Sequence, residues 1–177
     1  FARDNLFLAW DFAVASREHI LKPVQSMRDQ ALAYVDDNGF SYQIEQIDRD
    51  PNANMSTIVK GTFDVPCFLT DSNELVYDEA GTPIMQGMCA YPFTLGVPAV
   101  AHEKGNLRFT LIGHGIFGEG RGYIADHTSA HERTQPIAQA TESVVVATNW
   151  IGLSGGDRNL IISEVVGDLN RLSVVTD

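Results

Sequence analysis

Positive charge is scarce in this chain of 177 residues, and its scarcity excludes some classes of protein. The 12 lysine and arginine residues face 23 aspartate and glutamate residues, which gives a formal net charge of −11. Binding to a nucleic acid backbone requires a stripe of basic residues that displaces counterions, and the sequence has no such stripe. Its apolar runs all fall short of the roughly 20 residues that span a bilayer. We therefore expect neither a nucleic acid partner nor a transmembrane segment.

Cysteine is also scarce, with Cys67 and Cys89 as the only two thiols of the sequence. An even number permits one disulfide that closes the turn-rich stretch between them. Two buried thiols that pack as small apolar groups fit the sequence equally well. The chain opens at Phe1 without a basic segment followed by an apolar one, so we expect a processed product, either secreted or periplasmic.

Hydrophobic residues make up 44% of the chain and charged residues 20%, which is typical of a globular protein. Residues 1–106 are interpreted as an N-terminal extension followed by antiparallel strands. Residues 6–15 are rich in aromatic and aliphatic side chains and predict an extended segment. Ser16 offers a helix cap, and helical spacing predicts a helix over residues 23–35, with residues 17–22 as a separate turn.

Three further strands are expected in this first region. Alternating apolar and polar residues predict antiparallel strands over residues 41–48 and 57–69, joined by a polar turn. Pro66 places the second of these strands at a sheet edge or a bulge. Residues 71–87 predict an irregular excursion with at most a short hairpin, and residues 91–100 predict another strand.

Strands and helices alternate over residues 107–177, which differs from the pattern before them. Strands are expected at residues 107–113 and 143–150, and helices at residues 125–141 and 159–175. Continuous runs of Val and Ile indicate strands buried on both faces, and parallel neighbours need a crossover helix. The sequence therefore predicts an α/β fold whose βαβα C-terminal part is mostly parallel. Two parallel strands do not make a stable sheet, so we expect strands from another segment to complete it.

The most informative motif is GHGIFG at residues 113–118, directly after the first of these strands. Glycine lets the backbone approach a ligand closely. A strand that ends in such a turn can aim main-chain N–H groups at the oxygen anion of a tetrahedral intermediate. A tight turn that simply requires glycine is the alternative explanation of the motif.

The runs LRFTLIGHGIFGEG and VVVATNWIGLSGGD resemble the α/β-hydrolase superfamily, especially bacterial lipases and esterases, over about residues 107–175. The resemblance implies that residues 107–112 and 144–148 are the third and fourth strands of a partial hydrolase sheet. It also implies roles for individual residues. The oxyanion hole would use the backbone at Gly115 and Ile116. Three further residues would have a structural role and hold the loop in place, namely His114, Gly113 and Gly118.

The sequence leaves the catalytic triad unassigned. Ser154 lies in a GxSxG pattern that matches a nucleophile elbow, but the strand before it ends early and Asp157 predicts the helix cap. No histidine follows Ser154, and a hydroxyl without a base is a poor nucleophile. We therefore keep Ser154 as the less favoured candidate and expect the nucleophile in a missing segment or an associated chain.

The remaining polar and aromatic groups add one candidate. His127 and His131 are four residues apart, but two ring nitrogens are too few for a tight metal site, so we expect no metal and no cofactor. Trp150 follows a strand at the edge where open α/β sheets bind ligands, and we expect it to line an acyl pocket.

The chain is thus interpreted as the N-terminal portion of a lipase- or esterase-like serine hydrolase for small esters, with the rest of the domain as its partner. The alternative is a noncatalytic binding or assembly protein with a hydrolase-like scaffold.

Overall fold

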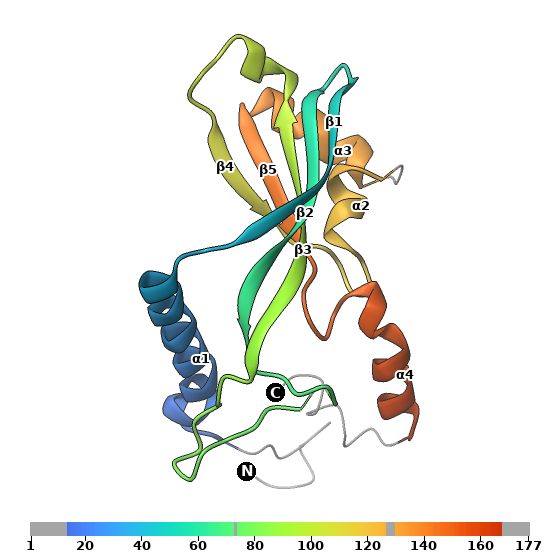
Figure 1. Cartoon of the computed structure of the whole chain (residues 1–177). Helices are drawn as coiled ribbons and strands as arrows, with labels where there is room; N and C mark the ends of the chain where they lie inside the picture. Colours follow the sequence, from blue (N-terminus) through green and yellow to red (C-terminus); the bar gives the residue numbers. More distant parts are fainter. Residues whose placement is uncertain (1–13, 73, 127–129, 168–177) are drawn as a thin grey trace, which may run out of the picture.

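A five-stranded sheet forms the centre of the computed structural model, which describes residues 14–72, 74–126 and 130–167 (Figure 1). The strands lie in the order β1-β2-β3-β5-β4. Only β4 and β5 run parallel, and the other neighbours are antiparallel. This mixed sheet with flanking helices confirms the α/β class that the sequence predicts.

The first element is α1 (Arg17–Asn38), a single helix that is longer than the predicted one. The Ser16 hydroxyl accepts the N–H of His19 at 3.0 Å, which caps the helix. Pro23 lies inside the helix instead of starting it. The prediction of a separate turn at residues 17–22 is wrong, because the Ser16 cap already satisfies the first turn upstream of the proline.

Three antiparallel strands follow, and their pairing agrees with the sequence. The turn between the first two is tighter than predicted, because Asn52 Oδ1 accepts the N–H groups of Asn54 and Met55 at 2.9 and 3.2 Å. Pro66 pairs with Met88 beyond the point where the edge strand stops, so its missing N–H costs no bond on the open side. These strands are β1 (Tyr42–Asn52), β2 (Met55–Cys67) and β3 (Gly87–Pro98).

The C-terminal part contains the predicted crossover between two parallel strands. β5 also pairs antiparallel with β3, so the parallel part is limited to the β4–β5 pair. One sheet therefore contains both the strands of residues 42–98 and those of residues 108–148. Of the helix predicted over residues 125–141, the described structure contains α3 in the second part, and the short helix α2 lies before the predicted range. The elements are η2 (Ala99–His102), β4 (Arg108–Ile112), α2 (Gly120–Ile124), α3 (His131–Ala140), β5 (Ser143–Thr148), η3 (Gly155–Asp157) and α4 (Arg158–Gly167).

Gly120 explains why the crossover begins early. A Cβ atom at Gly120 would lie 2.9 Å from the backbone nitrogen and oxygen of Thr148, so only glycine lets α2 start directly against the end of β5. Most of the segment predicted to be extended at residues 6–15 lies outside the described residues. The same holds for residues 168–175 of the last predicted helix.

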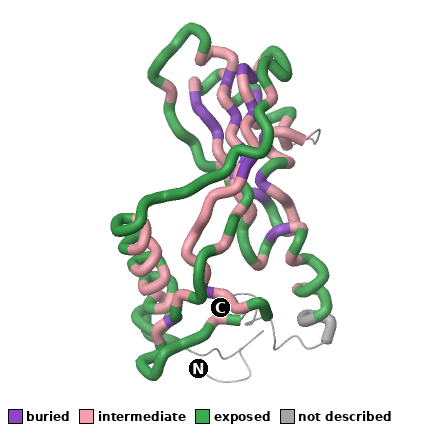
Figure 2. The backbone as a smooth tube through the Cα atoms, in the orientation of Figure 1, coloured by how far each residue is buried: buried purple, intermediate pink, exposed green. Residues whose placement is uncertain are grey.

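One face of the sheet is covered by α2 and α3, and the hydrophobic core lies between this face and the two helices. Figure 2 shows the buried positions gathered on the upper strands and the helices beside them. Gly96 permits close packing here, because a Cβ atom would lie 2.9 Å from Ile124 Cγ2. Each fully buried aliphatic side chain contributes about 1.5–3 kcal/mol to folding. The core residues are Met55, Ile58, Ile124, Ala138, Val145 and Ala147.

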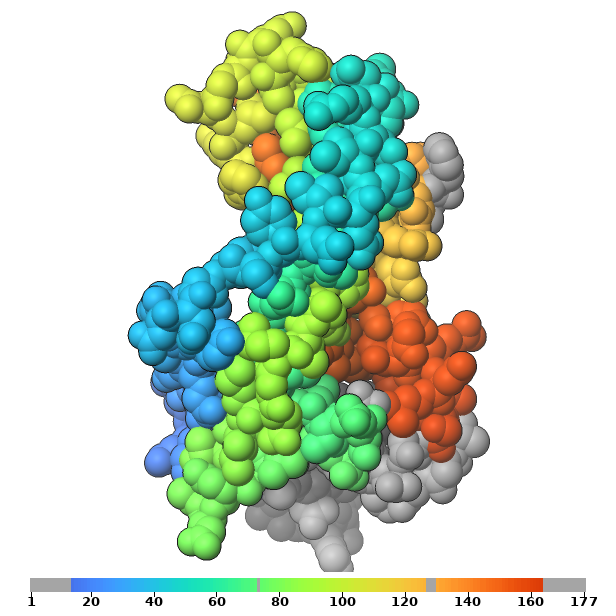
Figure 3. Space-filling model, in the orientation of Figure 1, coloured from blue at the N-terminus to red at the C-terminus, as the bar shows by residue number. Residues whose placement is uncertain are grey.

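The opposite face of the sheet carries an apolar row that no described helix covers. Strand register aligns Val59, Leu95, Val146 and Leu111 across β2, β3, β5 and β4. In the space-filling view, β5 (orange) is visible at the bottom of a hollow between β4 and β1 (Figure 3). Leu111 is 73% exposed and Phe109, on the same strand and face, is 75% exposed. Among the described strands β4 pairs only with β5, so its outer edge is open to another strand.

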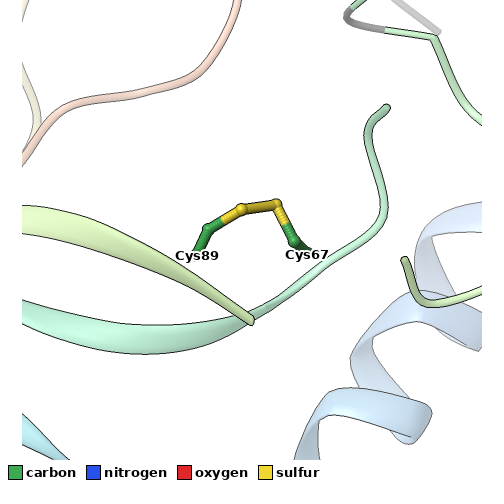
Figure 4. The surroundings of a disulfide bond; sticks show 2 residues. All are labelled: Cys67 and Cys89. Carbon is green, nitrogen blue, oxygen red and sulfur yellow. A yellow bond between two sulfur atoms is a disulfide. The ribbon is translucent and has the colours of Figure 1, made fainter. Parts of the chain in front are cut away.

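The excursion between β2 and β3 is closed by a disulfide between Cys67 and Cys89, whose Cα atoms are 5.5 Å apart (Figure 4). The alternative of two free thiols, which the sequence leaves open, is thereby excluded. Helix α1 rests on this excursion, because Gln30 Nε2 donates to the Pro83 carbonyl at 2.8 Å. A stable disulfide is typical of oxidising compartments and is compatible with an extracellular protein. No helix in the described part of the chain is long and apolar enough to cross a membrane.

Reduction of the Cys67–Cys89 disulfide should lower the free energy of unfolding by about 3 kcal/mol, because the bond closes a loop in the unfolded chain. The two cysteines are 22 positions apart. Urea unfolding followed by circular dichroism, with and without dithiothreitol, measures the change. The double variant C67S/C89S serves as control and should match the reduced protein in both conditions. Coinciding midpoints for the oxidised and reduced protein would contradict the prediction.

Candidate functional site

The candidate site lies where two loops leave the same edge of the sheet. The His-Gly loop (residues 113–119) follows β4, and the Trp150 loop (residues 149–154) follows β5. Because β4 and β5 are parallel neighbours, both loops start at the carboxyl ends of their strands, the edge where open α/β sheets bind ligands. The two loops lie beside each other, since Gly118 and Ser154 form a parallel bridge.

His114 uses one ring nitrogen to join the two loops and the other to hold its own loop. The side chain is buried, at 7% exposure. Its Nδ1 donates to the Gly115 carbonyl at 2.8 Å, and its Nε2 accepts the backbone N–H of Trp150 at 2.8 Å. These bonds fix a neutral ring with its proton on Nδ1. An Nε2 atom that accepts a backbone N–H is not available as a base, so His114 holds the loops together.

Backbone hydrogen bonds continue the connection beyond His114. The N–H of Phe117 donates to the Leu153 carbonyl at 2.7 Å, and the N–H of Gly155 donates to the Gly118 carbonyl at 3.0 Å. Phe117 has φ +59°, a left-handed conformation that a bulky residue rarely adopts. Such strain costs about 1–3 kcal/mol and persists only where the surroundings enforce it. The His-Gly loop is therefore held in a conformation that it would not adopt by itself.

The two amides of the predicted oxyanion hole differ in their surroundings. The turn over residues 115–118 is closed by the Gly118 N–H, which donates to the Gly115 carbonyl at 2.9 Å. The Gly115 N–H donates to the hydroxyl of Tyr123 at 3.0 Å. The Ile116 N–H has no acceptor among the described residues. Of the two amides, that of Ile116 therefore stays free for a ligand.

Ser154 acts as a helix cap. It is buried, at 7% exposure, and its hydroxyl donates to Asp157 Oδ2 at 2.5 Å. Its N–H donates to the same oxygen at 2.9 Å, which completes a capping box with Asp157 in the third helical position. The cap that the sequence predicts at Asp157 lies three residues earlier, at Ser154. In the described part of the chain, no histidine nitrogen is hydrogen-bonded to the Ser154 hydroxyl.

Tyr91 on β3 faces the same carboxylate. Burial raises the pKa of the Tyr91 phenol, and the negative charge of Asp157 raises it further. The phenol is therefore protonated at neutral pH and well above it, since the shift favours the neutral form. The Tyr91 side chain is therefore uncharged near Asp157 and cannot serve as a base there.

Trp150 packs against the start of the His-Gly loop. A Cβ atom at Gly113 would lie 2.4 Å from Trp150 Cζ2, and the Trp150 ring centroid lies 5.8 Å from that of His114. The ring is about half exposed at the mouth of the site. A groove of about 280 Å³ lies nearby, between Lys60 and Glu119, but Trp150 does not line it. The expected acyl pocket at Trp150 is therefore not enclosed by the described residues.

The remaining candidates concern metal binding. His127 lies outside the described residues, and His131 begins α3. The described residues contain no group of three or more His, Cys, Asp or Glu side chains that could hold a metal ion.

Comparison of the chain with protein-family models, with curated proteins and with solved structures gives no match. Function therefore has to be argued from the site itself. Sequence reasoning missed two of its parts, the Tyr123 hydroxyl on the Gly115 amide and the left-handed backbone at Phe117. No sequence pattern marks the tyrosine, since the contact depends on how α2 folds back over the loop. The left-handed residue has no signal either, because glycine or asparagine normally occupies that position of a turn.

Replacement of Gly113 by alanine should destabilise the protein by about 1–3 kcal/mol, because the new methyl group overlaps the Trp150 ring. Tryptophan fluorescence should shift at the same time as the ring moves. Gly105→Ala is the matched control, since nothing lies within 4 Å of a Cβ atom there. Thermal unfolding with fluorescence detection measures both variants. Equal midpoints for the two variants would show that Trp150 does not pack on Gly113.

Proposed function

We propose that this chain is the N-terminal portion of an α/β-hydrolase that acts on carboxylic esters, of the lipase or esterase kind. In the reaction, this chain would supply one hydrogen-bond donor of the oxyanion hole. The observation that carries the proposal is the Ile116 N–H, which has no acceptor among the described residues and is held in a strained loop at the carboxyl end of a parallel strand. Attack on an ester places negative charge on the carbonyl oxygen, and preorganised N–H donors stabilise that charge.

Preorganisation is the property that the geometry supports best. A donor is most effective when it does not have to reorient as charge develops. The buried His114 ring and the Phe117–Leu153 backbone bond hold the loop on both sides of Ile116. A simple glycine turn, the alternative explanation of the motif, would need neither a buried histidine nor a left-handed phenylalanine.

The nucleophile would come from a strand that pairs with the open edge of β4. The Ser154 hydroxyl is occupied by Asp157, which speaks against Ser154. A strand parallel to β4 would end at the same edge as β4, so a serine just after it would stand beside the Ile116 amide. Such a strand, with the elements that follow it, would bury Phe109 and Leu111. Burial of each side chain would contribute about 1.5–3 kcal/mol.

The segment that supplies this strand would belong to the same gene product or to an associated chain. The cell compartment that we propose is the exterior or the periplasm, and the disulfide supports it because such bonds persist under oxidising conditions.

A noncatalytic binding or assembly protein is the second candidate. The observation in its favour is that the described residues bring no serine, histidine and carboxylate together as a triad. In that case the open edge of β4 would serve association alone, and the free Ile116 N–H would have no reaction to support.

Proline at position 116 provides the sharpest test, because Ile116→Pro removes the N–H and little else. Residue 116 is the second residue of the turn, where proline is well tolerated. The full gene product, treated with a fluorophosphonate, should be labelled on a serine outside residues 14–167. I116P should be labelled about 100-fold more slowly, since loss of one donor has an effect of that order.

Ile116→Ala is the matched control, because it shortens the side chain but keeps the N–H, and it should be labelled like the unchanged protein. Label on Ser154 would contradict the proposed origin of the nucleophile. Equal rates for I116P and I116A would contradict the role of the amide. Absence of any label would favour the noncatalytic protein.

A further inference from the structure

We propose that the hydroxyl of Tyr123 is a second donor to the oxyanion, beside the Ile116 N–H. The inference rests on the proposed function and adds a residue for which neither the motif nor the resemblance gives a role. It starts from one contact, the 3.0 Å hydrogen bond in which the Gly115 N–H donates to Tyr123 Oη.

That contact removes one expected donor from the site. The Gly115 N–H points at the tyrosine hydroxyl, so it is not available to a ligand in this arrangement. Of the two amides of the predicted oxyanion hole, only that of Ile116 then remains for a ligand. The hydroxyl takes the place of the Gly115 amide, because an oxygen that accepts one hydrogen bond still carries a proton to donate.

The proton of the Tyr123 hydroxyl is uncommitted in the described part of the chain. No described residue accepts a hydrogen bond from it. The hydroxyl lies beside Gly115, and the next residue along the turn, Ile116, has the other free donor. Two neighbouring donors without acceptors form a site for an oxygen that carries negative charge. The bond from Gly115 also polarises the hydroxyl and strengthens its donation, since linked hydrogen bonds reinforce one another.

The ring of Tyr123 holds this hydroxyl in place. Tyr123 is half-buried and packs against the hydrophobic core, next to Ile124 in α2. Gly120, at the start of the same helix, donates its N–H to Asn149 Oδ1 at 2.8 Å. The helix is therefore fixed to the end of β5, and the hydroxyl is supported by packing and not by a flexible loop. Rigid support of this kind is what a preorganised donor needs.

The chemical role is donation of a hydrogen bond without proton transfer. When a nucleophile adds to the ester carbonyl, the π electrons move onto the carbonyl oxygen, and the Tyr123 O–H and the Ile116 N–H both donate to it. When the intermediate collapses, this electron pair re-forms the C=O double bond and the ester C–O bond breaks, and the alcohol leaves with the proton that the nucleophile's hydroxyl gave up through the base of the missing segment. The tyrosine keeps its proton throughout, so its effect appears in the rate of the chemical step and not in substrate binding.

Tyr123→Phe tests the proposal, with hydrolysis of 4-nitrophenyl butyrate by the full gene product as the assay. We expect kcat to fall about 100- to 1,000-fold with an unchanged KM, as for loss of an oxyanion donor. The Gly115 N–H does not replace the lost donor in this variant. The tyrosine hydroxyl lies between this N–H and the oxyanion, so the N–H is too far away to reach it. Tyr77→Phe is the matched control, since Tyr77 belongs to the distant excursion, and its kcat should equal that of the unchanged protein.

A second variant keeps the test valid if Y123F fails to fold, as judged by circular dichroism. Incorporation of 3-fluorotyrosine at position 123 preserves the ring and makes the hydroxyl a stronger donor. We expect kcat to be retained or raised in this variant. A fall of kcat in the fluorinated variant to the level of Y123F would overturn the proposal.

The outcomes separate this inference from the function on which it rests. If the unchanged protein hydrolyses the ester and Y123F has the same kcat as Y77F, the role of Tyr123 is refuted and the hydrolase stands. If Y123F changes KM alone, Tyr123 contacts substrate without stabilising the oxyanion, and the inference is again refuted. If the unchanged protein neither hydrolyses the ester nor reacts with a fluorophosphonate, both proposals fall together.

Discussion

A single buried imidazole holds the candidate site together. His114 donates to the carbonyl of its own loop and accepts the N–H of Trp150 from the next one. Without the ring, the Trp150 N–H would lose its acceptor, and the Gly115 carbonyl would keep only the Gly118 N–H. The left-handed Phe117 and the free Ile116 amide lie in the loop that this ring fixes. The His114 ring thus fixes the position of the loop that presents this amide.

The sheet around the site has one well-packed face and one open side. Met55, Ile124 and Val145 belong to the core under α2 and α3, while Phe109 and Leu111 on β4 are exposed to solvent. The free donor lies at the end of the strand whose edge is open. A site that is rigid on one side and open on the other is suited to receive a strand that brings the missing reactive group.

The sequence predicts the elements better than it predicts the site. The strand pairing in the first half and the crossover between β4 and β5 follow from alternation, from runs of Val and Ile and from turn residues. Ser16 is predicted as a helix cap, but the helix itself is predicted to start only at residue 23, because Pro23 is a strong competing signal for a helix start. Within the site, the motif locates the loop, but the partners of its amides depend on tertiary contacts. Tyr123 and Gly115 meet only because α2 packs back against β5, and no spacing rule encodes that approach.

Amide hydrogen exchange, resolved by residue with NMR, tests the central claim most directly. If His114 joins the loops as described, the N–H groups of Trp150 and Phe117 are engaged and exchange slowly, while the Ile116 N–H exchanges close to the rate of an unstructured peptide. Slow exchange at Ile116 would show that its amide is already occupied. Fast exchange at Trp150 would show that the imidazole does not hold the loops together.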